Sequence, residues 1–161
     1  CTYLNLLLEL VIVILVTAFY KSYVGGAHAK TNLICFISST IIFLAPILIP
    51  KYITFSKFSM YILDILVLVS SAYIIIKVAP GDTEEIPILK RKRRNKMKIK
   101  ATIIFTFLYF SAVFFINNLY FTQIVLLTIL FINLMATNLA YKMFGCKHSY
   151  ESEEFVQYFN S

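Results

Sequence analysis

Two residue pairs in this chain combine a thiol with an imidazole, and they are its first candidates for chemistry. Cys35 follows His28 by seven residues, and His148 follows Cys146 by two. A neighbouring imidazole can take the proton of a thiol, and the resulting thiolate is a nucleophile. The second pair lies in an acidic stretch that disfavours a thiolate, and it is two ligands short of a structural zinc site. We therefore take the first pair as the candidate for nucleophilic catalysis.

The spacing alone does not bring His28 to Cys35. On one unbroken helix the two residues would share a face but lie about 10.5 Å apart along the axis, too far for proton transfer. Gly25 and Gly26 precede them, and two glycines permit positive φ angles and a tight fold. We expect His28 on a re-entrant loop above a helix that begins near Thr31, with Cys35 one turn into it. Judged on these two residues alone, a loop histidine and a cysteine that fills an apolar gap are the alternative.

The composition indicates that the elements holding this pair lie in a membrane. Of the 161 residues, 60% are hydrophobic and 14% are charged, whereas a soluble domain has roughly 45–50% and about 25%. Only helices or closed barrels satisfy their backbone groups in a bilayer, and the alternation typical of barrels is absent. The sequence therefore predicts an all-α, polytopic membrane helix bundle. Five apolar stretches are the predicted spans, of which the first, second and fourth are short for a full crossing: Leu4–Tyr20, Leu33–Ile49, Phe58–Ala79, Ala101–Ile116 and Leu119–Tyr141.

Basic residues predict how the spans are oriented. We expect one transmembrane domain over residues 1–141, with loops at 21–32 and 80–100, followed by a tail at 142–161. Most of the lysines and arginines fall in these two loops and the tail, and basic residues in short loops mark the cytoplasmic side. His28 is then at the cytoplasmic face, and the start of the chain is outside. We therefore expect that the chain begins inside a longer protein with a sixth span upstream.

Two segments of the chain resemble the accessory gene regulator B (AgrB) family, the membrane cysteine endopeptidases of peptide quorum sensing in Gram-positive bacteria. One is G-G-A-H-A-K-T-N-L-I-C, from Gly25 to Cys35, where the family has its catalytic histidine and cysteine at this spacing. The other is A-P-G-D-T-E-E-I-P-I, from Ala79 to Ile88, followed by a basic stretch. It is similar to the family's A-P-A-D-T-x-x-x-P-I element and departs from it at Gly81, where alanine is usual.

The resemblance implies a mechanism for the pair. The Cys35 thiolate would attack a carbonyl of an AgrD-like propeptide, release its C-terminal part and form an acyl-thioester, with His28 as the proton carrier. A side chain of the peptide, usually a cysteine, would then close a thiolactone ring. The resemblance also implies a homodimer in the bacterial cell membrane. No third catalytic residue is visible; Asp82 and Glu84 lie on the same side, but a surface turn explains them better.

The basic run after Pro87 has three interpretations. It sets topology and contacts anionic lipid, at about 1 kcal/mol per basic residue near the surface. It also docks the acidic C-terminal segment of the propeptide, an expectation taken from the family. Nucleic-acid binding is disfavoured because no aromatic platform or groove-reading helix accompanies the run. The residues tentatively assigned to docking are Lys90, Arg91, Lys92, Arg93 and Arg94.

Polar residues inside the predicted spans need partners. Glu9 and Asp64 would cost about 2.5–3.5 kcal/mol each as charges at a helix centre, so we expect them to snorkel outward or stay protonated, with a place in the bundle interior as the alternative. Gln123, Asn133 and Asn138 are expected to make interhelical hydrogen bonds.

The sequence contains no P-loop, metal-ligand cluster or dinucleotide fingerprint, so we expect no cofactor and no metal. Two functions other than proteolysis remain: a non-enzymatic membrane carrier or scaffold for a peptide, and a redox sensor that uses Cys35.

Overall fold

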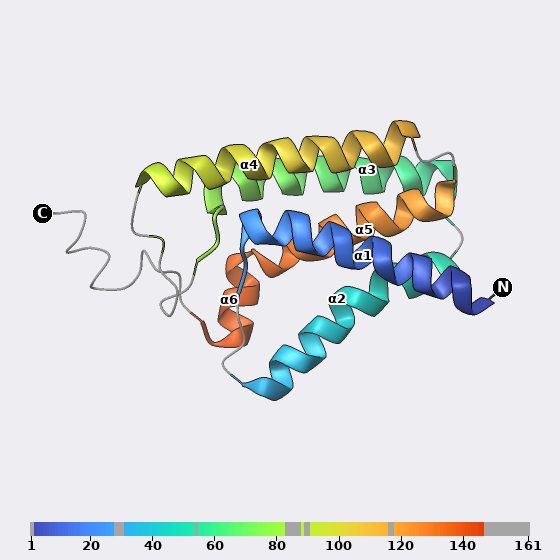
Figure 1. Ribbon diagram of the computed structural model, residues 1–161, viewed down its shortest axis with the longest axis horizontal. Coiled ribbons are helices and arrows are strands. Elements are labelled where there is room, and N and C mark those ends of the chain that lie inside the picture. The colour runs from blue at the N-terminus through green and yellow to red at the C-terminus, as the bar shows by residue number, and fades with distance from the viewer. Residues whose placement is uncertain are drawn as a thin grey trace, which may run out of the picture.

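The computed structural model describes residues 2–27, 31–53, 55–82, 88, 91–115 and 118–146, and over this part the chain is an all-α, polytopic membrane bundle (Figure 1). Two of the longer helices end in a π-helical turn, labelled η. In chain order the elements are α1 (Thr2–Val24), α2 (Asn32–Tyr52), α3 (Lys57–Tyr73) with η1 (Ile74–Val78), α4 (Arg91–Phe110) with η2 (Ser111–Phe115), α5 (Leu119–Met135) and α6 (Asn138–Phe144).

Within the described residues, all five predicted stretches are mostly helical. Among the described residues, α1, α2, α3 with η1, and α4 with η2 are each long and apolar enough to cross a bilayer, and α5 with α6 would make a fifth crossing. That fifth stretch is not one straight helix, because α5 and α6 meet at 66°. Thr137 lies at the bend and starts α6 by accepting a hydrogen bond from the Ala140 amide at 3.4 Å.

The two predicted cytoplasmic loops are shorter than expected. Helix α1 continues to Val24, so Lys21 is helical rather than part of a loop over 21–32. Helix α4 begins at Arg91, so most of the basic run is helical rather than part of a loop over 80–100. Lysine and arginine are good helix formers, and no glycine or proline interrupts either segment before Gly25 or after Pro87. The short first and fourth spans are therefore extended by polar turns.

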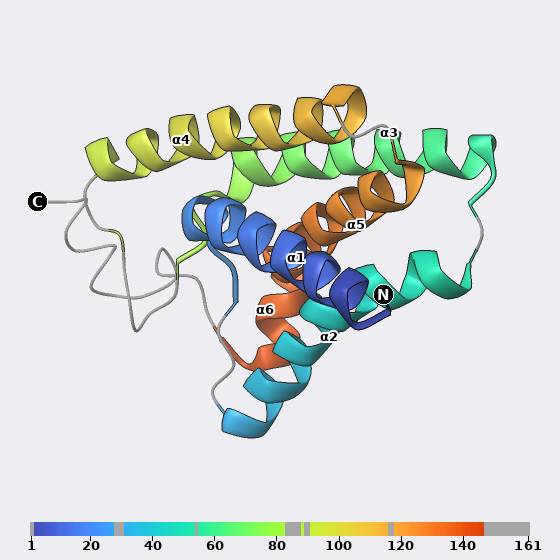
Figure 2. The same cartoon turned by 45° about the vertical axis from the view of Figure 1, so that its right-hand side comes forward.

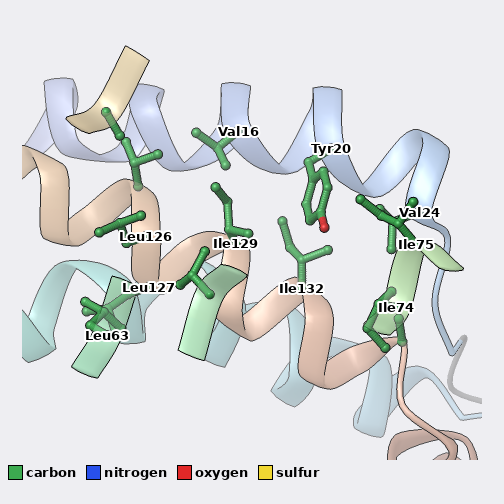
Figure 3. Close-up of a cluster of buried hydrophobic side chains, with 14 of the residues drawn as sticks. Val16, Tyr20, Val24, Leu63, Ile74, Ile75, Leu126, Leu127, Ile129 and Ile132 are labelled. Atoms are coloured by element: carbon green, nitrogen blue, oxygen red, sulfur yellow. The ribbon is translucent and has the colours of Figure 1, made fainter. Parts of the chain in front are cut away.

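Helix α5 is the centre of the bundle, with α1, α2 and α3 packed around it (Figures 1 and 2). Every residue from 122 to 129 is buried, and a helix that is apolar all round is one that other helices enclose. Val16, Tyr20 and Val24 of α1 face Leu126, Ile129 and Ile132 of α5, and Leu63 of α3 with Ile74 and Ile75 of η1 close the core (Figure 3).

Hydrogen bonds join the helices within this core. The Tyr20 hydroxyl donates to Asn133 Oδ1 at 2.9 Å, and Asn133 Nδ2 donates to Ser70 Oγ and Ser71 Oγ at 3.0 and 2.8 Å. Gln123 Nε2 contacts Met60 Sδ at 3.4 Å. The predicted interhelical roles of Asn133 and Gln123 are confirmed, and the three helices α1, α3 and α5 are held in register by one amide.

Most of the basic residues that the structure describes lie at one end of the bundle, whereas Lys51 and Lys57 flank the α2–α3 connection. The last turn of α1, the first turns of α2 and α4, and α6 lie there, away from the α2–α3 connection (Figures 1 and 2). We call it the basic end, defined by Lys21 and the helical run from Arg91 to Lys100. The placement of this end at the cytoplasmic face remains a prediction.

Candidate functional site

Cys35 lies in the first turn of α2, at the basic end. Thr31 caps this helix by accepting a hydrogen bond from the Ile34 amide at 3.4 Å, and the Cys35 amide donates to the Thr31 carbonyl at 3.0 Å. The helix start predicted near Thr31 is thus confirmed. The side chain of Cys35 is exposed, and no residue of α2 before Ile42 is buried. A thiol in this position is accessible to a reactant.

The glycine doublet turns the chain at the end of α1. Gly25 and Gly26 have φ angles of +76° and +148°, in the region that favours glycine. The next residue, Ala27, is buried, and its amide donates to the Met135 carbonyl at 3.1 Å, which anchors the turn on the end of α5. His28 lies outside the described residues, so the approach of its imidazole to the Cys35 sulfur stays a prediction.

The glycine doublet pairs with the segment after η1. The Gly81 amide donates to the Val24 carbonyl at 2.7 Å, and the Gly26 amide donates to the Gly81 carbonyl at 3.2 Å. A Cβ on Gly25 would lie 2.0 Å from the Gly81 oxygen, so this approach requires glycine. We call the pairing of residues 24–27 with residues 79–82 the glycine junction. It connects the two segments on which the family resemblance rests.

Helix α6 covers the glycine junction. The hydroxyl of the buried Tyr141 donates to the Asp82 carbonyl at 3.2 Å, and Tyr141 packs with Ala27. A Cβ on Gly81 would lie 2.9 Å from that hydroxyl and 3.0 Å from the Gly26 amide nitrogen. The departure from the family's alanine at this position therefore coincides with a tight contact to α6.

The assignment of Asp82 to a surface turn is wrong. Its side chain is 1% exposed and forms an ion pair with Arg94, with Oδ2 2.8 Å from Nη1. The same oxygen accepts a hydrogen bond from the Ile88 amide at 3.0 Å. Because breaking a buried pair costs about 3–5 kcal/mol, Asp82 and Arg94 fasten the first turn of α4 to the glycine junction. Glu84 lies outside the described residues.

The residues tentatively assigned to substrate docking have different environments. Arg94 is the partner of Asp82, so its charge is already balanced there. Arg91, Lys92 and Arg93 are exposed at the start of α4, and their role in docking stays a prediction. Lys90 lies outside the described residues.

An apolar groove of about 400 Å³ runs between α1 and α2. It is lined by Leu10, Ile14, Phe36, Ser39, Thr40, Phe43 and Leu44, and we call it the α1–α2 groove. Ser39 and Phe43 follow Cys35 by four and eight residues, so they share its face of α2. Cys35 therefore lies on the same face of α2 as these two residues, although it is not itself part of the groove's lining.

Lys21 lies in the last turn of α1, where a loop was predicted. It lines a cavity on the side of α1 that faces α4, together with Thr17, Gly81 and Arg93. The uninterrupted helical sequence up to Gly25 is the signal that could have placed it, because it puts Lys21 on a helix face rather than in a loop.

The two intramembrane acids differ in environment. Glu9 is 6% exposed and accepts a hydrogen bond at Oε1 from the Tyr120 hydroxyl at 2.9 Å, so it faces α5 and does not snorkel outward. Its other oxygen, Oε2, has no hydrogen-bond partner among the described residues. Asp64 is half-buried on α3. Neither acid lines the α1–α2 groove.

Cys146 follows α6 at the far side of the glycine junction. It packs against the cluster of Ala27, Ala140 and Tyr141, and its thiol is 3.7 Å from the Phe144 carbonyl. His148 lies outside the described residues.

Comparison with known proteins found related sequences over most of the chain. A family model described as accessory gene regulator B matches residues 1–137. Accessory gene regulator protein B of Staphylococcus saprophyticus is 38% identical over 117 residues, covering 73% of this chain and 58% of that protein. The Staphylococcus intermedius protein of the same name is 37% identical over 105 residues, or 65% of this chain and 53% of that protein.

A putative AgrB-like protein of Clostridium acetobutylicum is more distant, at 30% identity over 101 residues, which is 63% of this chain and 46% of that protein. The chain thus spans about half the length of these curated relatives. No solved structure matches it.

Proposed function

The chain belongs to the accessory gene regulator B family, and from that membership we propose that it acts in peptide quorum sensing as a membrane cysteine endopeptidase. Its substrate is an AgrD-like propeptide, which it cleaves at the membrane surface through a thioester on Cys35. The observation that carries this proposal is the position of Cys35, which is exposed at the start of α2 and shares a helix face with Ser39 and Phe43 of the apolar α1–α2 groove.

Cys35 lies in the first turn of α2. The thiolate rather than the thiol is the nucleophile. His28, seven residues before Cys35, takes the thiol proton in this proposal.

The reaction then proceeds by acyl transfer. The Cys35 thiolate adds to a backbone carbonyl of the propeptide, and the carbonyl oxygen becomes an oxyanion. Collapse of this intermediate breaks the C–N bond, and the imidazolium of His28 gives its proton to the departing amine. A thiolate of the peptide next attacks the thioester, which releases Cys35 and closes a thiolactone.

The start of α2 offers donors for the oxyanion. Backbone amides at a helix N-terminus lack partners within the helix, and such amides can stabilise a developing oxyanion. The amides of Ile34 and Cys35 donate to Thr31. Those of Asn32 and Leu33 have no acceptor among the described residues, and we assign the oxyanion to them.

The α1–α2 groove suits a substrate that lies in the membrane. Its lining is almost wholly apolar and it faces the bilayer rather than the core. An apolar segment of the propeptide bound there would bring the adjoining backbone to Cys35. Since the scissile carbonyl would then be near the interface, less water would compete for the thioester.

Substitution of the two proposed catalytic residues tests the function. We expect Cys35→Ser and His28→Ala, each in the full-length protein in liposomes, to abolish cleavage of an AgrD-like propeptide as followed by mass spectrometry. Cys146→Ser is the matched control and should cleave normally, because that thiol packs beside α6. Normal cleavage by Cys35→Ser or by His28→Ala would contradict the proposed catalytic pair. Peptide binding or transport that survives alkylation of Cys35, without cleavage, would instead favour a non-enzymatic peptide carrier.

A further inference from the structure

Two adjoining cavities lie at the basic end, on the side of α1 that faces α4. The first, of about 470 Å³, is bounded by Thr17, Lys21 and Gly25 of the α1 segment and by Arg93 and Met97 of α4, with Gly81 and Asp82 at the glycine junction. The second, of about 450 Å³, includes Tyr23, Lys96 and Lys100. Ser22, Arg93 and Met97 line both cavities. We call the pair the α1–α4 pocket.

The α1–α4 pocket is positively charged. Four cations line it: Lys21, Arg93, Lys96 and Lys100. Asp82 lines it as well, but its carboxylate is balanced by the ion pair with Arg94. The Lys100 ammonium stands over the Tyr23 ring, 5.3 Å from its centroid, which orders this side of the pocket. An anion is therefore the ligand that the charges favour.

The surface next to the pocket indicates what carries the anion. Ala18 lines the first cavity, and it continues an exposed stripe along α1 at a spacing of three or four residues, made of Leu8, Val11 and Leu15. This stripe is apolar and runs from the pocket towards the middle of the bilayer. A ligand with a charged head and long apolar chains would fit both parts together.

We propose that the α1–α4 pocket binds the phosphate of one anionic phospholipid, whose acyl chains lie along the α1 stripe. Basic pockets between transmembrane helices are known to bind lipid headgroups. The general attraction of basic residues to anionic lipid was expected for the whole run, whereas this proposal assigns one site to particular residues. It does not depend on the peptidase activity.

Lipid titration of paired variants tests the site. Full-length protein purified in detergent is titrated with phosphatidylglycerol, with phosphatidylcholine as reference, and bound lipid is counted by native mass spectrometry. At about 1 kcal/mol per basic residue, we expect the double variant Arg93→Gln, Lys96→Gln to bind phosphatidylglycerol roughly tenfold or more weakly. The control Arg91→Gln, Lys92→Gln removes the same charge outside the pocket and should lose less than about threefold. Equal losses would mean diffuse attraction and overturn the site.

A further arm identifies the ligand. Glycerophosphoglycerol, which has the headgroup without acyl chains, should fail to displace the lipid at equal concentration. Displacement by it, or stronger displacement by an acidic peptide, would assign the pocket to a soluble phosphate or to a peptide and overturn the lipid.

Discussion

Substitution of Gly25 by alanine should destabilise the whole basic end. The residue has a φ of +76°, and an added Cβ would lie 2.0 Å from the Gly81 carbonyl oxygen. Since that contact is to backbone, the junction must open by more than 1 Å to relieve it. Opening would break the hydrogen bonds from the Gly81 amide to Val24 and from the Gly26 amide to Gly81.

The loss of unfolding free energy in Gly25→Ala can be estimated from the strained backbone angle and the two lost hydrogen bonds. An L-residue in the left-handed region costs roughly 1–2 kcal/mol. A buried backbone group that loses its partner costs about 1–3 kcal/mol, and two hydrogen bonds are lost. We therefore expect the Gly25→Ala protein to unfold with a free energy lowered by at least about 3 kcal/mol.

The control is another glycine with a similar backbone angle. Gly145 has a φ of +67° at the exposed end of α6, so Gly145→Ala should incur the conformational cost alone. Both variants and the wild type are unfolded by titration with sodium dodecyl sulfate in mixed micelles, and the midpoints and slopes give the free energies. If the two alanine variants differed by less than about 1 kcal/mol, the close approach at the glycine junction would not have the importance that we infer.

The same titration checks three other interactions. Asn133→Leu removes the amide that joins three helices and should cost about 1–2 kcal/mol; no loss would contradict the hydrogen-bond network. Asp82→Ala leaves Arg94 without its carboxylate and should cost about 3 kcal/mol or more, a loss that a second change of Arg94→Met should partly reverse. Glu9→Leu strands the Tyr120 hydroxyl and should cost about 1 kcal/mol, whereas Glu9→Gln keeps the acceptor and should be close to neutral.

The sequence predicts the helices better than their ends. Apolar stretches of bilayer length identify the spans, because nothing else can cover so much hydrophobic surface. The charged turns that extend α1 to Val24 and start α4 at Arg91 have no such signal, since a basic residue beside a membrane suits a loop as well as a helix. The 66° bend at Thr137 is likewise set by local capping within an apolar run.

The candidate site, like the helices, can be predicted from the sequence only in part. The positive φ angles of the glycine doublet and the start of α2 follow from local chemistry, and the structure has both. The loop that would carry His28 over Cys35 stays a prediction. The burial of Asp82 depends on Arg94, twelve residues later, and on the cover provided by Tyr141. Contacts between segments so far apart cannot be derived from the spacing of one chain, which is why an acid in a polar stretch was assigned to the surface.

The anchor of the glycine turn also constrains when the site can form during biosynthesis. The Ala27 amide is held by the Met135 carbonyl, and the cover over the turn comes from Tyr141. While the ribosome has made only the first half of the chain, neither Met135 nor Tyr141 exists. The segment that leads to His28 therefore lacks both of these contacts. A nascent protein would therefore carry its cysteine into the membrane long before the neighbouring turn is fixed, and maturation of the site would await insertion of the last helices.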